Sequence, residues 1–289
     1  MQEEKNYDIS HEDLQKVMSS VEIPACPAAV TDAMQEAQKD EPDLSRLADV
    51  ITSDAGMSAA AIKLANSPIY GASTKISGVR KAVERLGTKN VVCVIIATAL
   101  RSSMTGLPAA WVEQFWKRVT LVAIAASIIA RRQYGISPDA AYTYALFHDA
   151  AIPLMMRRFP DYAGIYEKCQ AEELMLVEAE KNYFPCTHPI VGSLLVRNWG
   201  LPGLLGKAIR FHHEEDVYEL PDRTLPGGAL SLIAVTQVAE YLVTEAIHGN
   251  DLEVGADQFA RALVHLGISE GDLDELRGLV ATAVEESLH

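Results

Sequence analysis

Histidine and aspartate side chains recur in this sequence at positions where they could bind a metal ion. An adjacent pair, His148-Asp149, lies in an apolar segment, and His188 and the pair His212-His213 follow later in the chain. Helical bundles gather metal ligands at their centre from separated positions of this kind. Asp149, His188, His212 and His213 would offer three nitrogens and a carboxylate, a set that suits zinc, iron or manganese, and His148 is a fifth candidate ligand.

The same residues also have a simpler interpretation. His148 and His188 could be core histidines that are hydrogen-bonded and bind nothing, and one residue of the pair His212-His213 could be exposed beside the acidic segment 214–216. No other ligand set competes with the histidines, because the four cysteines are scattered without a close pair and form neither a zinc knuckle nor a CxxC motif.

Hydrophobic periodicity places these residues on helices. Apolar residues of the segment 79–86 recur at i, i+3, i+4 and i+7, with Ser77 placed to cap a helix and Gly87 placed to end it. Further helix starts are predicted at Pro42-Asp43, at Ser137-Pro138 and at Thr187. Val91–Leu100 is rich in β-branched residues, but the helical pattern on both sides favours a central helix. With no alternating strand pattern and no repeat, the sequence predicts an all-α, non-repeating helical bundle.

Composition restricts the partners. The chain has 289 residues, of which 49% are hydrophobic, and a formal net charge of -14. A negative field of this size repels nucleic acid and anionic lipid surfaces. The segment Met1–Lys5 lacks the apolar core of a secretory signal, and the longest apolar run, Val119–Ala130, is too short to cross a bilayer. We therefore expect a cytoplasmic protein that binds neither nucleic acid nor membrane.

A series of short motifs resembles the HDOD family. The motifs are Ile23–Pro27, Ile51–Asp54, Leu64–Gly71, Ala82–Gly87, Trp116–Ala123, Leu146–Pro153, His188–Gly192, Trp199–Pro202 and Ala208–His213. This resemblance implies an all-α, HD-domain-like fold, kinship with the HD phosphohydrolases, and a role as an output module of bacterial signalling proteins in which the catalytic set is usually incomplete. It covers residues 20–215, which we predict to be the HDOD domain, with an N-terminal helical half (20–107) and a degenerate HD-like half (108–215). Residues 1–19 are expected to form a lead-in helix, and residues 216–289 to form C-terminal helices that complete the bundle.

The resemblance also implies which site residues are present. In HD hydrolases a first His, the His-Asp doublet and a distant Asp hold one metal, and further histidines complete a second site. Here His148-Asp149 matches the doublet, whereas the first His is replaced by Arg118 and the distant Asp falls near Thr236 or Gln237. A guanidinium is always protonated and cannot bind a metal ion, so we predict that Arg118 forms an ion pair with Asp149 in place of the metal.

Catalysis is weakened further by the residues around the doublet. Ala151 and Ile152 stand where active HD phosphodiesterases carry a lysine shortly after the doublet, and no Gly-Tyr-Pro element follows His213. The expected function is therefore a regulatory or output module that acts through protein-protein interaction with other signalling proteins, without catalysis and without a cofactor. The degenerate pocket would be formed by Arg118, His148, Asp149, His188, His212, His213 and Gln237, and could accept a small anionic ligand. The alternative is a metal-dependent phosphohydrolase that uses a partly retained site built from His148, Asp149, His188, His212 and His213.

Overall fold

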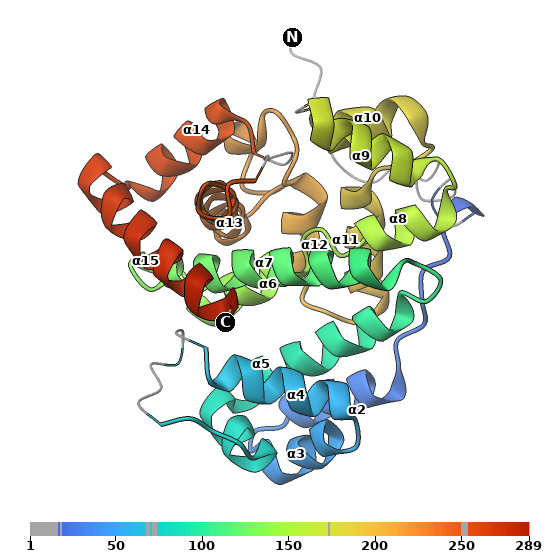
Figure 1. Ribbon diagram of the computed structural model, residues 1–289, viewed down its shortest axis with the longest axis vertical. Helices are drawn as coiled ribbons and strands as arrows, with labels where there is room; N and C mark the ends of the chain where they lie inside the picture. Colours follow the sequence, from blue (N-terminus) through green and yellow to red (C-terminus); the bar gives the residue numbers. More distant parts are fainter. Residues whose placement is uncertain are drawn as a thin grey trace.

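The computed structural model shows a bundle of α-helices (Figure 1). It describes residue 17 and residues 19–67, 70, 74–172, 174–249 and 254–288. The helices are α2 (Ala28–Ala37), α3 (Leu44–Thr52), α4 (Ala55–Ala65), α5 (Val79–Ser103), α6 (Ala109–Ala130), α7 (Pro138–Phe147), α8 (Ile152–Arg158), α9 (Tyr162–Glu172), α10 (Leu176–Tyr183), α11 (His188–Asn198), α12 (Gly203–Phe211), the 3-10 turn η2 (Val217–Glu219), α13 (Gly227–Ala246), α14 (Ala256–Leu266) and α15 (Glu270–Leu288). No strand occurs among the described residues, which confirms the predicted all-α class. Most of the predicted lead-in helix and part of the motif Leu64–Gly71 lie outside the described residues.

An N-terminal group of helices, α2 to α5, forms the lower part of the molecule in Figure 1. Its long member, α5, packs against α2, α3 and α4 and contains the segment Val91–Leu100, so this segment is helical as predicted. The helix is interrupted at Gly87, which has φ 69° and ψ 170°, a backbone conformation open almost only to glycine. The predicted cap at Ser77 is wrong by one residue, because Gly78 occupies the N-cap position.

The larger part of the molecule is organised around α6 and α13. Helix α6 packs against α7, α13 and α15, and α13 also contacts α12 and α14. Among the described helices, α13 alone is long and apolar enough to cross a membrane, but 72% of its apolar stretch is buried inside the protein. This burial is typical of the core helix of a globular protein.

Local signals in the sequence set the starts of the helices. Asp43 and Ser137 cap α3 and α7 by accepting hydrogen bonds from the backbone N–H groups of Ser45 and Ala140. Thr187 stands at the N-cap of α11 as predicted, but its side chain makes no capping hydrogen bond. The cap at Ser137 thus fixes the start of α7, the helix that ends next to His148-Asp149.

The two groups of helices are joined by the segment that precedes α2. The indole N–H of Trp199, at the end of α11, donates a hydrogen bond of 2.8 Å to the backbone carbonyl of Pro24. The guanidinium of Arg158 donates to the carbonyl of Ser20. These contacts attach the N-terminal group to the helices that carry the candidate site.

Candidate metal centre

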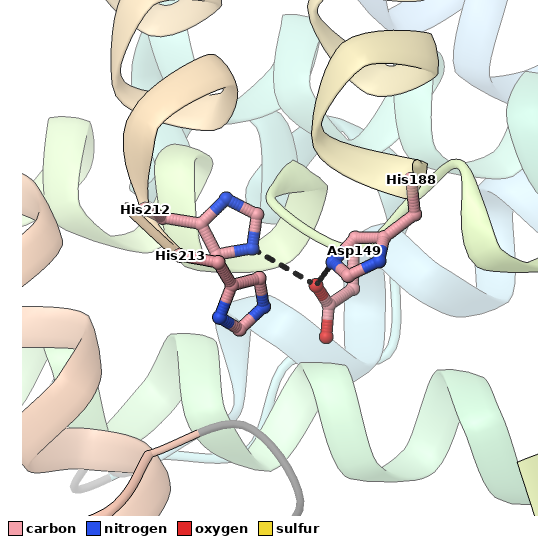
Figure 2. A group of neighbouring side chains, drawn as sticks. All are labelled: Asp149, His188, His212 and His213. Carbon is pink, nitrogen blue, oxygen red and sulfur yellow. Dashed lines mark ion pairs between the residues drawn. The ribbon is translucent and has the colours of Figure 1, made fainter. Parts of the chain in front are cut away.

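The predicted ligands come from different parts of the chain and meet in the interior. His148 is the C-cap residue of α7, and Asp149 lies between α7 and α8. His188 begins α11, and His212-His213 directly follow α12. All five side chains are buried. Figure 2 shows Asp149, His188, His212 and His213 as one group of neighbouring side chains.

Four of these residues form a compact set of ligand atoms. One nitrogen from each of His188, His212 and His213 and one carboxylate oxygen of Asp149 all lie within 4.8 Å of one another. The Oδ1 atom of Asp149 is 3.4 Å from Nε2 of His188 and 3.5 Å from Nε2 of His212 (Figure 2).

The distances within this set suit a shared ion better than direct hydrogen bonds. Asp149 Oδ1 and the Nε2 atoms of His188 and His212 are buried and have no hydrogen-bond partner, and separations of 3.4 and 3.5 Å are long for a hydrogen bond. Two ligand atoms that each lie roughly 2.1 Å from a tetrahedral metal ion are roughly 3.4 Å apart. The residues present therefore fit a divalent metal ion, with a donor set of three imidazoles and one carboxylate.

Hydrogen bonds at the opposite ring nitrogens orient two of the imidazoles. Nδ1 of His212 lies 2.7 Å from the backbone carbonyl of Ile209, which can only accept, so Nδ1 carries the proton. Nδ1 of His188 likewise donates to Oε2 of Glu180 at 2.8 Å. Each ring then presents Nε2 to Asp149, the arrangement found in metal-binding histidines whose outer nitrogen is held by an acceptor.

Burial keeps two of the histidines neutral. It lowers the pKa of His212 to about 4, with a further contribution from neighbouring His213. It lowers the pKa of His213 to about 3, with a further contribution from positively charged His188. Both imidazoles are therefore uncharged at neutral pH, which is the protonation state that a metal ligand requires.

A second cluster adjoins the first through the same aspartate. Nε2 of His148 lies 3.2 Å from Oδ2 of Asp149 and 3.2 Å from Oε1 of Glu240, and Nδ1 of His148 donates to the carbonyl of Ala145 at 2.8 Å. Burial alone would lower the pKa of His148, but the two carboxylates raise it well above its usual value. His148 is therefore a cation held between two anions.

The positive charges of this second cluster keep its carboxylates ionised. Burial would raise the pKa of Asp149, but His148 and the other neighbouring histidines hold it well below its ordinary value. The pKa of Glu240 is also lowered, chiefly by His148 and to a smaller extent by Arg118. Nη2 of Arg118 lies 3.8 Å from Oε1 of Glu240. Two cations thus stand beside two carboxylates.

The other predicted pocket residues have partners that the sequence did not indicate. Arg118 lies beside Glu240, and the ion pair with Asp149 stays a prediction. The side-chain oxygen of Gln237 accepts a hydrogen bond from Tyr218, and its amide nitrogen is 3.5 Å from the backbone carbonyl of His212. Gln237 therefore supports the backbone behind the ligands.

Sequence reasoning missed two buried glutamates. Glu240 lies on α13 one turn beyond Thr236 and Gln237, and an acidic residue at that spacing in an apolar helix is a signal that could have identified it. Glu180 is fully buried against His188, but nothing in the sequence distinguishes it from exposed Glu178 on the same helix. Its role is visible only once α10 and α11 are packed together.

Comparisons with known proteins agree with the fold and with the resemblance. A model of the HDOD domain family matches residues 23–215. No curated protein matches the sequence significantly.

Solved structures share the fold at low sequence identity. An HDOD domain protein of unknown function from Geobacter sulfurreducens is 23% identical, with a TM-score of 0.68, and the alignment covers 95% of this chain and 97% of that chain. A protein from Shewanella amazonensis named as a candidate phosphohydrolase is 22% identical, with a TM-score of 0.69 and coverage of 98% and 100%. A protein from Marinobacter aquaeolei named as a candidate signal transduction protein is 20% identical, with a TM-score of 0.71, and the alignment covers 98% of this chain and 66% of that chain.

Proposed function

Because this chain belongs to the HDOD family, we propose that it is a regulatory module of a bacterial signalling system, which acts by binding a partner protein and does not turn over a substrate. In this proposal the interior holds a single divalent metal ion through Asp149, His188, His212 and His213, whereas HD hydrolases use a pair of metal sites. The resemblance assigns the doublet His148-Asp149 to the other site of those enzymes, and here the doublet forms a cluster with Glu240.

The observation that carries the proposal is the pair of cations in that second cluster. His148 is held between two carboxylates, and Arg118 lies 3.8 Å from one of them. A divalent ion would have to displace a proton at either cluster, from His148 or from His188, whose pKa values nearby carboxylates raise. At the second cluster it would also stand close to the guanidinium of Arg118, which stays protonated and repels it. The two carboxylates are already balanced by internal cations, so they gain little from a metal.

The metal-binding part of the proposal is supported by the first cluster. Three of its ligand atoms are buried without a hydrogen-bond partner, a condition that costs free energy unless another species satisfies them. When bound, a divalent ion would be able to polarise a phosphate and to activate water. The surrounding residues give it little assistance, because Ala151 and Ile152, which follow the doublet, are apolar and buried and offer no cation to a phosphate.

A second candidate function is a phosphohydrolase with one metal ion. Its metal ligands would include the two neutral imidazoles, His212 and His213, which are in the protonation state that metal binding requires at neutral pH. Such an enzyme would use the same four ligands, so metal binding alone does not separate the two functions.

The experiment that separates them combines metal counting with an assay of turnover. Purified wild-type protein is loaded with zinc or manganese, its metal content is measured by elemental mass spectrometry, and it is screened against phosphomonoesters and cyclic dinucleotides. We expect about one ion per chain and no turnover above that of the Asp149→Ala variant. Turnover that is lost in Asp149→Ala would overturn the proposal and support the phosphohydrolase.

Arg118→His tests whether the guanidinium keeps a metal ion out of the cluster of His148, Asp149 and Glu240. Removing the guanidinium and adding an imidazole is expected to raise the metal content from about one to about two ions per chain, with Glu240 as the additional carboxylate. Arg132→His is the matched control, since Arg132 follows α6 and forms an ion pair with Glu275 at the surface. A wild-type protein that already binds two ions would contradict the argument from charge.

A further inference from the structure

Glu180 connects the four-residue metal site to a separate pair of helices. Its Oε2 atom accepts two hydrogen bonds of 2.8 Å, from the backbone N–H and from the Nδ1–H of His188. Its Oε1 atom accepts a hydrogen bond from the hydroxyl group of Tyr162. The Glu180 and His188 side chains are both fully buried, so this carboxylate acts on the metal ligand without competition from bulk water.

The residues that hold His188 in this way belong to the α9–α10 hairpin, defined as residues 162–183. Its two helices pack chiefly against each other and against α8, and they lie at the edge of the molecule in Figure 1. Tyr162 and Leu176 anchor the hairpin in the core. The hairpin exposes Leu174 (45%) and Tyr183 (61%) to solvent.

We infer that Glu180 is a positioning residue that couples metal binding at His188 to the stability of the α9–α10 hairpin. This inference rests on the proposed function, because it requires a metal ion at the four-residue site. A carboxylate bonded to the outer nitrogen of a metal-binding histidine fixes the orientation of the ring and increases its basicity. A metal ion on Nε2 in turn holds the ring in the orientation in which Nδ1–H donates to Glu180.

The coupling is reciprocal. If the metal ion strengthens the contact between His188 and Glu180, a well-packed hairpin must also increase the affinity for the metal ion by the same factor. Metal occupancy at His188 would therefore change the stability of the α9–α10 hairpin.

Hydrogen exchange of the hairpin amides tests this coupling. Exchange of residues 162–183 is followed by mass spectrometry in the full chain, without metal and with zinc at a saturating concentration. In wild type we expect zinc to slow exchange of the hairpin several-fold. In Glu180→Gln, which keeps the size of the side chain but removes its charge, we expect no such slowing and a loss of zinc affinity of about 10- to 100-fold.

Two further variants separate coupling from a general loss of structure. Glu178→Gln is the matched control, because Glu178 lies on the same helix but is exposed and pairs with Lys181, and it should behave like wild type. Tyr162→Phe keeps the carboxylate and removes one of its three hydrogen bonds, so it should show an intermediate effect of zinc.

The outcomes distinguish this inference from the proposal beneath it. If wild type binds zinc and exchange of the hairpin does not change, the coupling is wrong and the metal site stands. The same conclusion holds if Glu180→Gln binds zinc and protects the hairpin as wild type does. If wild type binds no zinc under any condition, the metal site of the proposed function is wrong and the coupling is overturned with it.

Discussion

Replacing the buried carboxylate of Glu240 by an amide tests the charge network most sharply. Glu240 lies 3.2 Å from Nε2 of His148 and 3.8 Å from Nη2 of Arg118, and its side chain is only 5% exposed. In Glu240→Gln the new side chain still accepts a hydrogen bond from His148, but Arg118 loses a counter-ion and His148 keeps only Asp149. The variant therefore removes charge and leaves volume unchanged.

The size of the effect follows from burial and distance. A unit charge pair at about 4 Å interacts by about 4 kcal/mol at the effective dielectric constant of a protein site, and removing one member of a buried pair costs about 3 to 5 kcal/mol. The side chain of Arg118 is 22% exposed, so water screens part of its charge. We expect the lower end of that range, about 3 kcal/mol of unfolding free energy.

Thermal unfolding of the metal-free protein measures this loss. For a chain of 289 residues, about 3 kcal/mol corresponds to a decrease of about 5 °C in Tm. Glu245→Gln is the control, because Glu245 lies on the same helix and its ion pair with Arg277 is exposed; its Tm should change by less than about 2 °C. In addition, Arg118→Met combined with Glu240→Gln should cost less than the sum of the two single changes. A Tm of Glu240→Gln within 2 °C of wild type would refute the reasoning.

Three further perturbations test the packing and protonation of the site. Gly192→Ala would place a methyl group 2.9 Å from the side chain of Ile209. We expect this change to lower the unfolding free energy by about 1 to 3 kcal/mol and to weaken zinc binding. Gly206→Ala is the control, because its methyl group would lie 3.6 Å from the nearest neighbour and should leave stability and zinc binding unchanged. Gly87→Ala introduces a Cβ at φ 69° and should lower the unfolding free energy by about 1 to 3 kcal/mol in urea titration without changing the metal content; equal stability would show that the break in α5 is not strained. Burial lowers the pKa of His213 to about 3, so the metal-free folded state stays neutral there while the unfolded state gains a proton as pH falls below about 6.5. We therefore expect His213 to lower the unfolding free energy by about 2 kcal/mol between pH 7 and pH 5. If His213→Gln loses stability on acidification as steeply as wild type, His213 does not stay neutral in the folded protein.

The main ligands could be predicted from the sequence because their order and spacing are local facts. The doublet His148-Asp149 and the pair His212-His213 are each adjacent in the chain, and the sequence predicted them on helices. The structure places them just beyond the ends of α7 and α12. Their convergence required the resemblance to a family, since periodicity does not show which helix ends meet. The all-α class was likewise predictable, even at Val91–Leu100, where composition alone would permit a strand.

The glutamates and the partner of Arg118 could not be predicted in the same way. Alignment of motifs directed attention to Gln237, whereas Glu240 presents its carboxylate from the next turn of the same helix, roughly 4.5 Å further along its axis. Glu180 reaches His188 only because α10, a short helix without a recognisable motif, lies beside the start of α11. Which charged residues meet in the core depends on how helices distant in the sequence pack together, and a single sequence does not show that packing.

The central claim is that one metal ion is held by Asp149, His188, His212 and His213 beside a cluster that holds none. Elemental mass spectrometry of the untagged protein, before and after incubation with zinc, iron and manganese, tests it most directly, with His212→Gln as the variant that lacks one ligand. The account predicts about one ion per wild-type chain and a marked loss of that ion in the variant. Two ions per wild-type chain, or no metal above background after every incubation, would contradict it.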